Sequence, residues 1–491
     1  MKLNTLSKST FIRGLQCHKS LYLYKHRYFL RDKLSPEQLA KFKRGTKVGV
    51  LARQLFPGGF DASPPTHFQY AKAVEQTREL ITQNTPVIYE ASFSLNGVLV
   101  ALDILEHRDG KWYGYEVKSS LSISDTYLND AALQYHVISN CGVELADFSI
   151  IYMNKDYVRQ AELDLNQLFT TQSVLEETRS RQPMIAEEIA AQLKVTELSK
   201  SPAIDIGPHC NKPYPCDFQG HCWKHIPRNS IFELDWLSEE QQFELYTKKM
   251  LKLEDIPDDF LSDPVQKMKL QSHKTSTPFI DKESIRGFIE KIEYPVCFLK
   301  VWYHRPAVPL YEGTRPYEKL PFFIIAGRIS DPVLQPEIKN HYFEPGQNSL
   351  LDFSLLLSEV LETSKSIIIF DDPFLKEMAS VLRTGKQSGM ENFVHDLISV
   401  FTNNLFYDPI APEKNELPMV EQAIPATGKL MKDMFTSEVE ASTAYNDATG
   451  SMRGPGDFII RMESTSRFQL NAMLSFFHYL KKSGEPEFPT H

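Results

Sequence analysis

Two acidic residues and a lysine lie close together in the sequence, in a pattern that could hold a metal ion and activate water. Asp103 follows the apolar run VLVAL, and Glu116 and Lys118 close the aromatic segment 111–118. Carboxylate oxygens are hard ligands of the kind that Mg²⁺ and Mn²⁺ bind, and a bound divalent ion lowers the pKa of its water. Residues two apart on a strand share a face, so Lys118 could orient that water or help to deprotonate it. The pattern predicts metal-dependent phosphodiester hydrolysis.

Further polar residues follow and precede this trio. Asp130 and Gln134 stand four apart in a helical pattern and share one face of it, and Tyr135 comes next. Glu90, in an earlier β-rich segment, adds a further carboxylate. Acids and lysines are common, so the context carries the argument: a charge beside apolar strands is costly unless it has a partner or a function.

Cysteines form a second constellation. Cys210, Cys216 and Cys222 fall within thirteen residues, and Cys17 lies near the start of the chain. Six cysteines are too few for a disulfide-dense scaffold, and clustered thiols in a reducing compartment suggest a metal. Their alternative role is that of small buried hydrophobic residues. Cys141 and Cys297 lie outside the pattern, and we expect them to be inert core thiols.

Positive charge is concentrated at the start of the chain. The net charge is −9, yet residues 1–50 hold twelve lysines and arginines against two acids, a local charge of +10. Basic side chains interleaved with aromatic ones suit a surface that follows phosphates and stacks bases. A solvated helix face would look the same. The residues expected to contact nucleic acid are Lys19, Lys25, Arg27, Lys43, Arg44 and Tyr135.

The elements that must position these residues begin with helices and continue into strands. Asn96-Gly97 and Asp109-Gly110 are hairpin signals, so three successive strands should form a meander. The predicted helices are 7–30, 36–55, 67–83 and 125–141, and the predicted strands are 87–95, 97–105, 111–118 and 147–153. A polar stretch from 163 to about 200 is expected to be rich in helix.

The rest of the chain predicts a second α/β module after a connector. We expect residues 1–230 to form one domain, 231–290 a helical connector and 291–491 a second domain. Strands are predicted near 295–303, 322–328 and 366–370, and helices at 350–363, 373–383 and 389–402. Alternating strands and helices predict mixed sheets covered by helices. No apolar run is long enough for a membrane span, and the first residues lack a secretory signal, so we expect a cytoplasmic protein without membrane contact.

The arrangement of Glu90, Asp103, Glu116-x-Lys118 and Gln134-Tyr135 resembles the RecB-like branch of PD-(D/E)XK nucleases. Within it, the iron–sulfur branch places one cysteine before the nuclease core and three after it, as Cys17 and the later three are placed here. The resemblance implies that Glu90, Asp103 and Glu116 bind Mg²⁺ or Mn²⁺ and that Lys118 and Gln134 assist catalysis. It also implies a [4Fe–4S] cluster on the four cysteines, with tetrahedral zinc as the alternative.

Three longer segments, LSKSTFIRGLQCHKSLYL, GTKVGVLARQLFPGG and IGPHCNKPYPCDFQGHCW, resemble an uncharacterised bacterial family. Its members join such a nuclease to a ribonuclease-H-like module similar to DEDD exonucleases. Here Lys300 and Trp302 stand where that module's paired acids are expected, so we predict that it is inactive, with Asp371 and Asp396 as helix caps or surface acids. A second departure is Gly49, which stands where RecB-like nucleases carry a metal-binding histidine.

The resemblance implies a DNA nuclease, acting on single-stranded or end-containing DNA, in repair, defence or mobile-element processing. Two alternatives stay open at this point. One is a nucleic-acid-binding protein that does not cut and whose cluster is structural. The other is a zinc-stapled scaffold without a nucleic-acid role, against which the basic segment speaks. The choice between DNA and RNA, the polarity of cutting and the oligomeric state are not encoded in these motifs.

Overall fold

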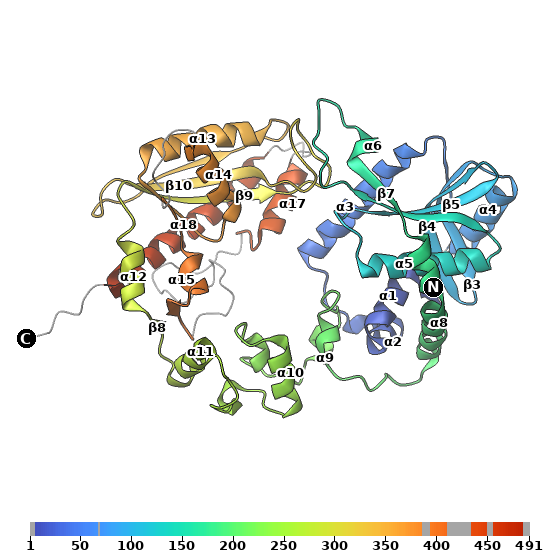
Figure 1. Cartoon of the computed structure of the whole chain (residues 1–491), viewed down its shortest axis with the longest axis horizontal. Helices are drawn as coiled ribbons and strands as arrows, with labels where there is room; N and C mark the ends of the chain where they lie inside the picture. Colours follow the sequence, from blue (N-terminus) through green and yellow to red (C-terminus); the bar gives the residue numbers. More distant parts are fainter. Residues whose placement is uncertain (1–4, 67–68, 385–392, 410–433, 449–454, 485–491) are drawn as a thin grey trace, which may run out of the picture. The chain divides into compact units, whose positions relative to one another are not determined.

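The computed structural model describes residues 5–66, 69–384, 393–409, 434–448 and 455–484 (Figure 1). The chain forms two compact units. The first comprises Met1–His225 with Arg305–Glu318, and the second comprises Ile226–His304 with Lys319–His491. Each unit has a mixed β-sheet flanked by helices, so the predicted α/β class is confirmed. Arg305–Glu318, placed in the C-terminal domain by the sequence, belongs with the first unit.

The first unit is built on a seven-stranded sheet in the order β2-β3-β4-β5-β6-β7, with β1 added beside β4. β3, β4 and β5 form the predicted antiparallel meander, and β6 runs parallel to β5. Positive φ angles at Asn96, Gly97, Asp109 and Gly110 make both tight turns, as their types predict. The strands are β1 (Leu6–Ser7), β2 (Phe60–Asp61), β3 (Val87–Leu95), β4 (Val98–Arg108), β5 (Lys111–Lys118), β6 (Leu145–Met153) and β7 (Phe169–Ser173).

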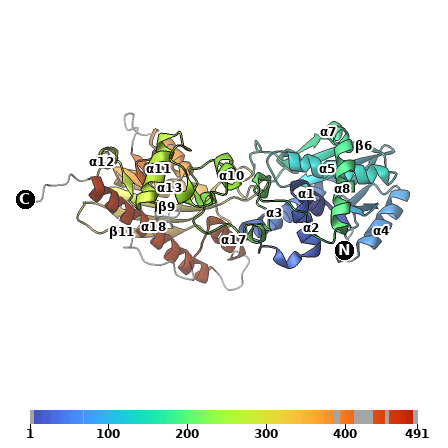
Figure 2. The same ribbon diagram turned by 90° about the horizontal axis from the view of Figure 1, so that it is seen from below.

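Helices cover this sheet. α5 connects β5 to β6 and packs its small and aliphatic residues into the main core, and α7 and α8 contact it (Figure 2). α3 begins at a capping box on Ser35 with a proline in its first turn, which explains its sharp start. The main helices are α1 (Lys8–Gln16), α2 (His18–His26), α3 (Pro36–Ala52), α4 (Tyr70–Thr82), α5 (Asp125–Asn140), α7 (Leu175–Ser180) and α8 (Gln182–Glu197).

One expectation for this unit was wrong in detail. The single helix predicted at 7–30 is two helices, because Cys17 between them is extended at φ −163° and ψ 117°. Its N–H still donates to Arg13 O and its carbonyl still accepts from Leu21 N, so the break leaves both groups bonded and the local sequence carries no breaker to reveal it. The polar stretch from 163 to about 200 is rich in helix, as predicted, and it also contains the edge strand β7, of which only Phe169 is buried.

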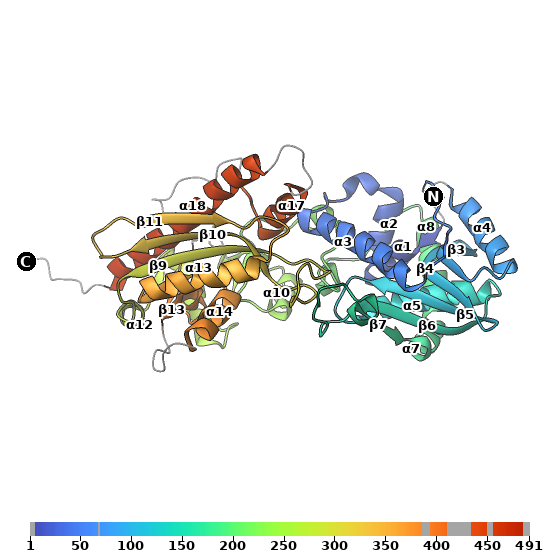
Figure 3. The same cartoon turned by 90° about the horizontal axis from the view of Figure 1, so that it is seen from above.

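The second unit has a five-stranded sheet in the order β11-β10-β9-β12-β13. β11, β10 and β9 are antiparallel neighbours, whereas β12 and β13 run parallel to β9. Alternate residues of β9 pack against α18 on one face and against α13 and α14 on the other (Figure 3). The strands are β9 (Val296–His304), β10 (Leu320–Ile329), β11 (Glu337–Tyr342), β12 (Ser366–Ile369) and β13 (Val394–Asp396), and the helices are α13 (Ser349–Thr363), α14 (Pro373–Thr384) and α18 (Gly456–Gly484).

Three elements of this unit differ from expectation. Within the segment predicted as a helix at 389–402, residues 394–396 form strand β13 and only Ile398–Thr402 is helical (α15), while 389–392 lie outside the described residues. β11 and the long α18 were not predicted. Residues 231–290 carry α10 (Glu239–Thr247), α11 (Pro264–Thr275) and α12 (Lys282–Ile289) and belong to the second unit. None of the helices described has the length and apolar character that crossing a membrane requires.

Candidate active site

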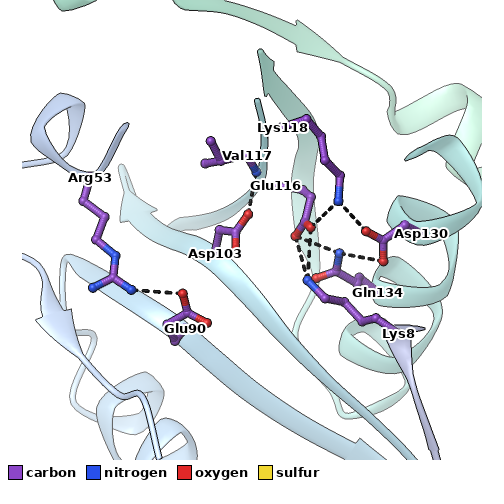
Figure 4. A network of polar contacts seen from close by, with 9 residues as sticks. All are labelled: Lys8, Arg53, Glu90, Asp103, Glu116, Val117, Lys118, Asp130 and Gln134. Atoms are coloured by element: carbon purple, nitrogen blue, oxygen red, sulfur yellow. Dashed lines mark hydrogen bonds and ion pairs between the residues drawn. The ribbon is translucent and has the colours of Figure 1, made fainter. Parts of the chain in front are cut away.

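Glu116, near the end of β5, is the centre of a buried polar network (Figure 4). Only 3% of its side chain is exposed. Lys8 Nζ lies 3.1 Å from each of its carboxylate oxygens, and Lys118 Nζ lies 2.6 Å from Oε1. Gln134 Nε2 donates to Oε2 at 2.8 Å. A buried carboxylate is stabilised when it receives several hydrogen bonds and charges of this kind.

The sheet register places Asp103 beside Glu116. Ile104 of β4 pairs with Tyr115 of β5, so the next cross-strand position joins Asp103 to Glu116, and cross-strand neighbours share a face. Asp103 Oδ2 accepts the backbone N–H of Val117 at 2.6 Å, which fixes that carboxylate against β5. The structure therefore brings Asp103, Glu116 and Lys118 together at one edge, as the sequence predicted.

α5 supplies the other side of the network. Asp130 and Gln134 lie one turn apart and are both buried. Asp130 Oδ2 is 2.6 Å from Lys118 Nζ, and Gln134 Nε2 approaches Asp130 Oδ1 at 3.5 Å. The Oε1 atom of Gln134 is buried and has no hydrogen-bond partner among the residues described. An unpaired buried carbonyl oxygen is costly. The lone pairs of this atom are available to accept a hydrogen bond or to bind a metal ion.

The charged groups of the network shift one another's pKa values. Burial, followed by the negative charge of Glu116, raises the pKa of Asp103 to about 7. Burial acts in the same direction on Glu116, but the ammonium groups of Lys118 and Lys8 outweigh it and hold the pKa of that carboxyl well below its usual range. Burial would lower the pKa of Lys118, yet Asp130 and Glu116 raise it well above its usual value. Glu116 is therefore ionised between two cations, whereas Asp103 keeps its proton until near neutrality.

Glu90 lies on β3 in an unusual conformation. Its φ angle is +55°, and the β3–β4 register passes from Tyr89 to Ala91 without pairing it. Positive φ is rare for a residue with a side chain and is found mostly where surrounding structure enforces it, often at functional sites. Arg53 NH2 lies 2.9 Å from Glu90 Oε1, and Arg53 NH1 lies 2.7 Å from Asp61 Oδ2. Burial raises the pKa of Glu90.

Sequence reasoning missed three members of this site. Lys8 entered only as one positive charge among twelve, Arg53 was not singled out, and Asp130 was noted for its helical face without a role. Each comes to the site from a different helix or helix end. Lys8 is 108 residues from its partner Glu116, and Asp130 is 12 residues from its partner Lys118. No local motif marks such pairs. The spacing of Asp103, Glu116 and Lys118 could be recognised because a single hairpin makes it.

The four predicted cysteines line one small cavity in the first unit. Cys17 is the extended residue between α1 and α2, Cys210 ends a short 3₁₀ turn, and Cys222 ends α9 (Gln219–Cys222). Cys216 N donates to Cys210 O at 2.8 Å. Burial raises the pKa of the Cys17, Cys216 and Cys222 thiols. Chain segments almost two hundred residues apart thus share one thiol-lined space.

An ion-paired aspartate fastens the cysteine segment to the start of the chain. Asp217, between Cys216 and the α9 helix, accepts from the guanidinium groups of both Arg13 and Arg31. The two remaining cysteines lie elsewhere. Cys297 is buried in the second unit as expected, but Cys141 is exposed at the end of α5, so the prediction that it is a core thiol was wrong.

One observation does not support the predicted metal sites. Among the residues that the structure describes, no group of three or more histidine, cysteine, aspartate or glutamate side chains is arranged so that it could hold a metal ion. The oxygens of Glu116 face ammonium and amide groups instead, and the four cysteines share a cavity without forming such a group.

The residues expected to contact nucleic acid differ in exposure and in contacts. Lys19 Nζ donates to Ile204 O at 2.9 Å and Lys25 Nζ donates to Thr5 O, so both hold the fold together. Arg44 lies over the ring of Tyr317 at 5.3 Å. Arg27 and Lys43 are exposed, and Tyr135 OH accepts from Arg179 at 3.3 Å.

In the second unit, the residues expected to replace a metal site are Lys300 and Trp302 of β9. Lys300 Nζ lies 5.2 Å from the ring centre of the buried Trp302. Asp396 Oδ1 accepts the backbone N–H groups of Asp371 at 2.8 Å and Ile398 at 3.2 Å, but the N-cap of α15 is Leu397, so the prediction that Asp396 caps a helix was wrong. Asp372, which the sequence did not single out, accepts from Tyr303 OH at 2.9 Å.

Comparison with known proteins adds no further constraint. The chain matches none of the family models against which it was compared, and no curated protein matches it.

Proposed function

We propose that the first unit is a divalent-metal-dependent deoxyribonuclease with a PD-(D/E)XK core. The observation that carries the proposal is the convergence of Asp103, Glu116 and Lys118 on one edge of the sheet, beside Asp130 and Gln134 of α5. A buried group of acids around a lysine would be expensive in a purely structural role. Such clusters occur where charged substrates or metal ions are handled.

The donor set suits Mg²⁺ or Mn²⁺. The site offers the carboxylates of Asp103 and Glu116, with Glu90 on the neighbouring strand and the unpartnered Oε1 of Gln134. These are hard oxygen ligands on rigid strands and a helix. Asp103 and Glu116 would hold the ion, and Glu90 would add to the acidic field. A bound divalent ion would supply an activated water at neutral pH and polarise the phosphate.

The remaining residues have roles that follow from their contacts. Lys118 is held between Glu116 and Asp130, so its ammonium can orient a water molecule by donating to it. Gln134 fixes the direction of Glu116 by its amide hydrogen bond. Exposed Arg27 and Lys43 lie on the basic start of the chain, where they would contact phosphates of single-stranded or end-containing DNA.

We also propose that Cys17, Cys210, Cys216 and Cys222 hold a [4Fe–4S] cluster, with zinc as the alternative. The cavity that they share has apolar walls from Ile204, Ile206 and Phe218. Thiolate ligands in an apolar pocket suit either group, because cluster sites are shielded from water. Binding would require the raised thiol pKa values to fall as the ligands lose their protons. The bound cluster or zinc ion would join helices α1 and α2 to the segment that carries the three later cysteines.

For the second unit we propose a ribonuclease-H-like fold without catalysis. The mixed five-stranded sheet with helices on both faces supports the fold. The contact of Lys300 with Trp302, and the use of Asp396 to accept backbone N–H groups, support inactivity because metal clamps of this kind need converging carboxylates.

Cleavage assays test the proposed activity. Purified protein with Mn²⁺ or Mg²⁺ should degrade labelled single-stranded or end-containing DNA, and EDTA should abolish this. Linear, circular, duplex and RNA substrates separate the modes of attack. Glu144→Gln replaces an exposed glutamate in the same unit and controls for effects of purification and of the substitution itself. Binding of DNA without any metal-dependent cleavage would overturn the proposal and favour a nucleic-acid-binding protein that does not cut.

A further inference from the structure

The three cations beside the acidic site are held to different degrees. Arg53 bonds two carboxylates, those of Glu90 and Asp61. Lys118 also bonds two, those of Glu116 and Asp130, each at 2.6 Å. In the part of the chain that the structure describes, the Lys8 ammonium bonds Glu116 alone, at 3.1 Å. Its side chain is also more exposed than that of Lys118, at 26% against 17%. Lys8 is therefore the cation that the site can exchange at least cost.

The backbone of Lys8 is fixed although its side chain is loosely held. Leu6 N donates to Gly97 O at 2.7 Å, and the short strand β1 pairs with β4. Ser7 then caps α1, in which Lys8 is the first residue. A lysine ammonium that leaves Glu116 therefore stays within one side-chain length of the site, because its Cα atom cannot follow it.

A divalent ion and the Lys8 ammonium would compete for the same two oxygens of Glu116. Two cations at contact distance repel each other strongly at a site shielded from water. Lys118 would be retained by Asp130 when Glu116 binds a metal ion, whereas no second carboxylate among the described residues is bonded to Lys8. Metal binding should thus displace Lys8 and leave Lys118 in place.

We propose that Lys8 is an exchangeable internal cation, which neutralises Glu116 before metal binding and afterwards turns its ammonium to a phosphate of the nucleic-acid backbone. This inference rests on the proposed function of the same site. Lysine binds phosphate as a compact point charge with rotatable donors, so the small movement needs no fixed geometry. The consequence is an order of events: metal binds first, and the site then gains a phosphate-binding group.

The first test follows Lys8 itself in the wild-type protein. Ca²⁺ occupies oxygen sites, so brief acetylation with an amine-reactive reagent, read by mass spectrometry, can compare metal-free and Ca²⁺-loaded protein. We expect the labelling rate of Lys8 to rise about tenfold with Ca²⁺, and that of Lys111, an exposed lysine at the other end of β5, to stay constant. In Glu116→Gln the rise should be lost. Unchanged labelling of Lys8 when metal binding has been demonstrated would overturn the inference.

The second test uses Lys8→Met with Lys111→Met as its matched control. Removing a competing cation should tighten Mn²⁺ binding about tenfold, measured by electron paramagnetic resonance or calorimetry. It should also weaken DNA binding in Ca²⁺ without changing it in EDTA. A merely structural lysine predicts weaker or unchanged metal binding, which would overturn the inference. If wild-type protein binds no Mn²⁺ through Glu116, both the proposed function and this inference fail. If it binds Mn²⁺ but Lys8→Met does not tighten the binding, the inference fails alone, so the two failures are distinguishable.

Discussion

The Lys118 ammonium lies 2.6 Å from Asp130 Oδ2 as well as from Glu116 Oε1, so one buried lysine is shared by two carboxylates. Sequence reasoning left open whether this lysine orients water or takes its proton. Asp130 and Glu116 raise its pKa well above the usual value in spite of burial, and a lysine that holds its proton so firmly cannot accept another. Lys118 is therefore expected to act as a hydrogen-bond donor.

This role predicts a specific pattern for Lys118 variants. Lys118→Met should lower the turnover rate roughly 100-fold or more, because the oriented water is lost. Lys118→Arg, which can donate but cannot act as a base, should keep much more of the rate. Steady-state cleavage of a labelled single strand measures both. Rescue of Lys118→Met by the unprotonated form of an added primary amine would show that the lysine is a base after all.

Asp103 predicts a pH dependence of stability in the metal-free protein. Its pKa is about 7 in the folded state and near 3.8 when it is unperturbed, so the unfolded chain loses this proton first. The group's contribution to stability is therefore fully present below about pH 4 and is lost as the pH rises through 7. In EDTA, Asp103→Asn should gain stability relative to wild type between pH 5 and pH 8. Urea unfolding at the two pH values measures it, and an equal difference at both would count against the buried, protonated carboxyl.

The cysteine cavity predicts a dependence on metal that Cys17 controls. Cys17→Ser should remove the visible absorbance of an iron–sulfur cluster, or the bound zinc, and lower the melting temperature by about 5 °C or more. Cys141→Ser is the control, since Cys141 is exposed and lies apart from the cavity. Metal analysis and thermal unfolding provide the readouts. Unchanged metal content and stability in Cys17→Ser would exclude it as a ligand.

The ion pairs of Asp217 predict that the cysteine segment can be destabilised while all four cysteines are kept. Arg13 and Arg31 both bond this partly buried carboxylate and hold its pKa below the usual value despite burial. Asp217→Asn should destabilise the unit by about 2–4 kcal/mol, because two guanidinium groups lose the carboxylate that pairs with them. Chemical denaturation measures this change. Loss below about 0.5 kcal/mol would indicate that these pairs behave like exposed surface pairs.

The local part of the site could be predicted from the sequence, and the rest could not. Asp103, Glu116 and Lys118 belong to one hairpin whose turn residues and alternation fix the register, so their meeting follows from short-range rules. Lys8 and Arg53 reach the site through the packing of helices, which no spacing encodes. The break at Cys17 illustrates the same limit, because the helical pattern continues through it while the tertiary structure requires an extended residue. β11 was missed because none of its residues is buried and it carries no alternating apolar pattern, and α18 was not predicted either.

The most direct test of the central claim is the cleavage rate of Glu116→Gln relative to wild type, on labelled single- and double-stranded DNA at saturating Mn²⁺. Glutamine keeps the size of the side chain but removes the charge that binds the ion. The rate of Glu116→Gln should be at least about 100-fold lower on every substrate, and that of Glu144→Gln should be unchanged. Activity of Glu116→Gln within about threefold of wild type would contradict it, and would place catalysis elsewhere in the chain, including the second unit.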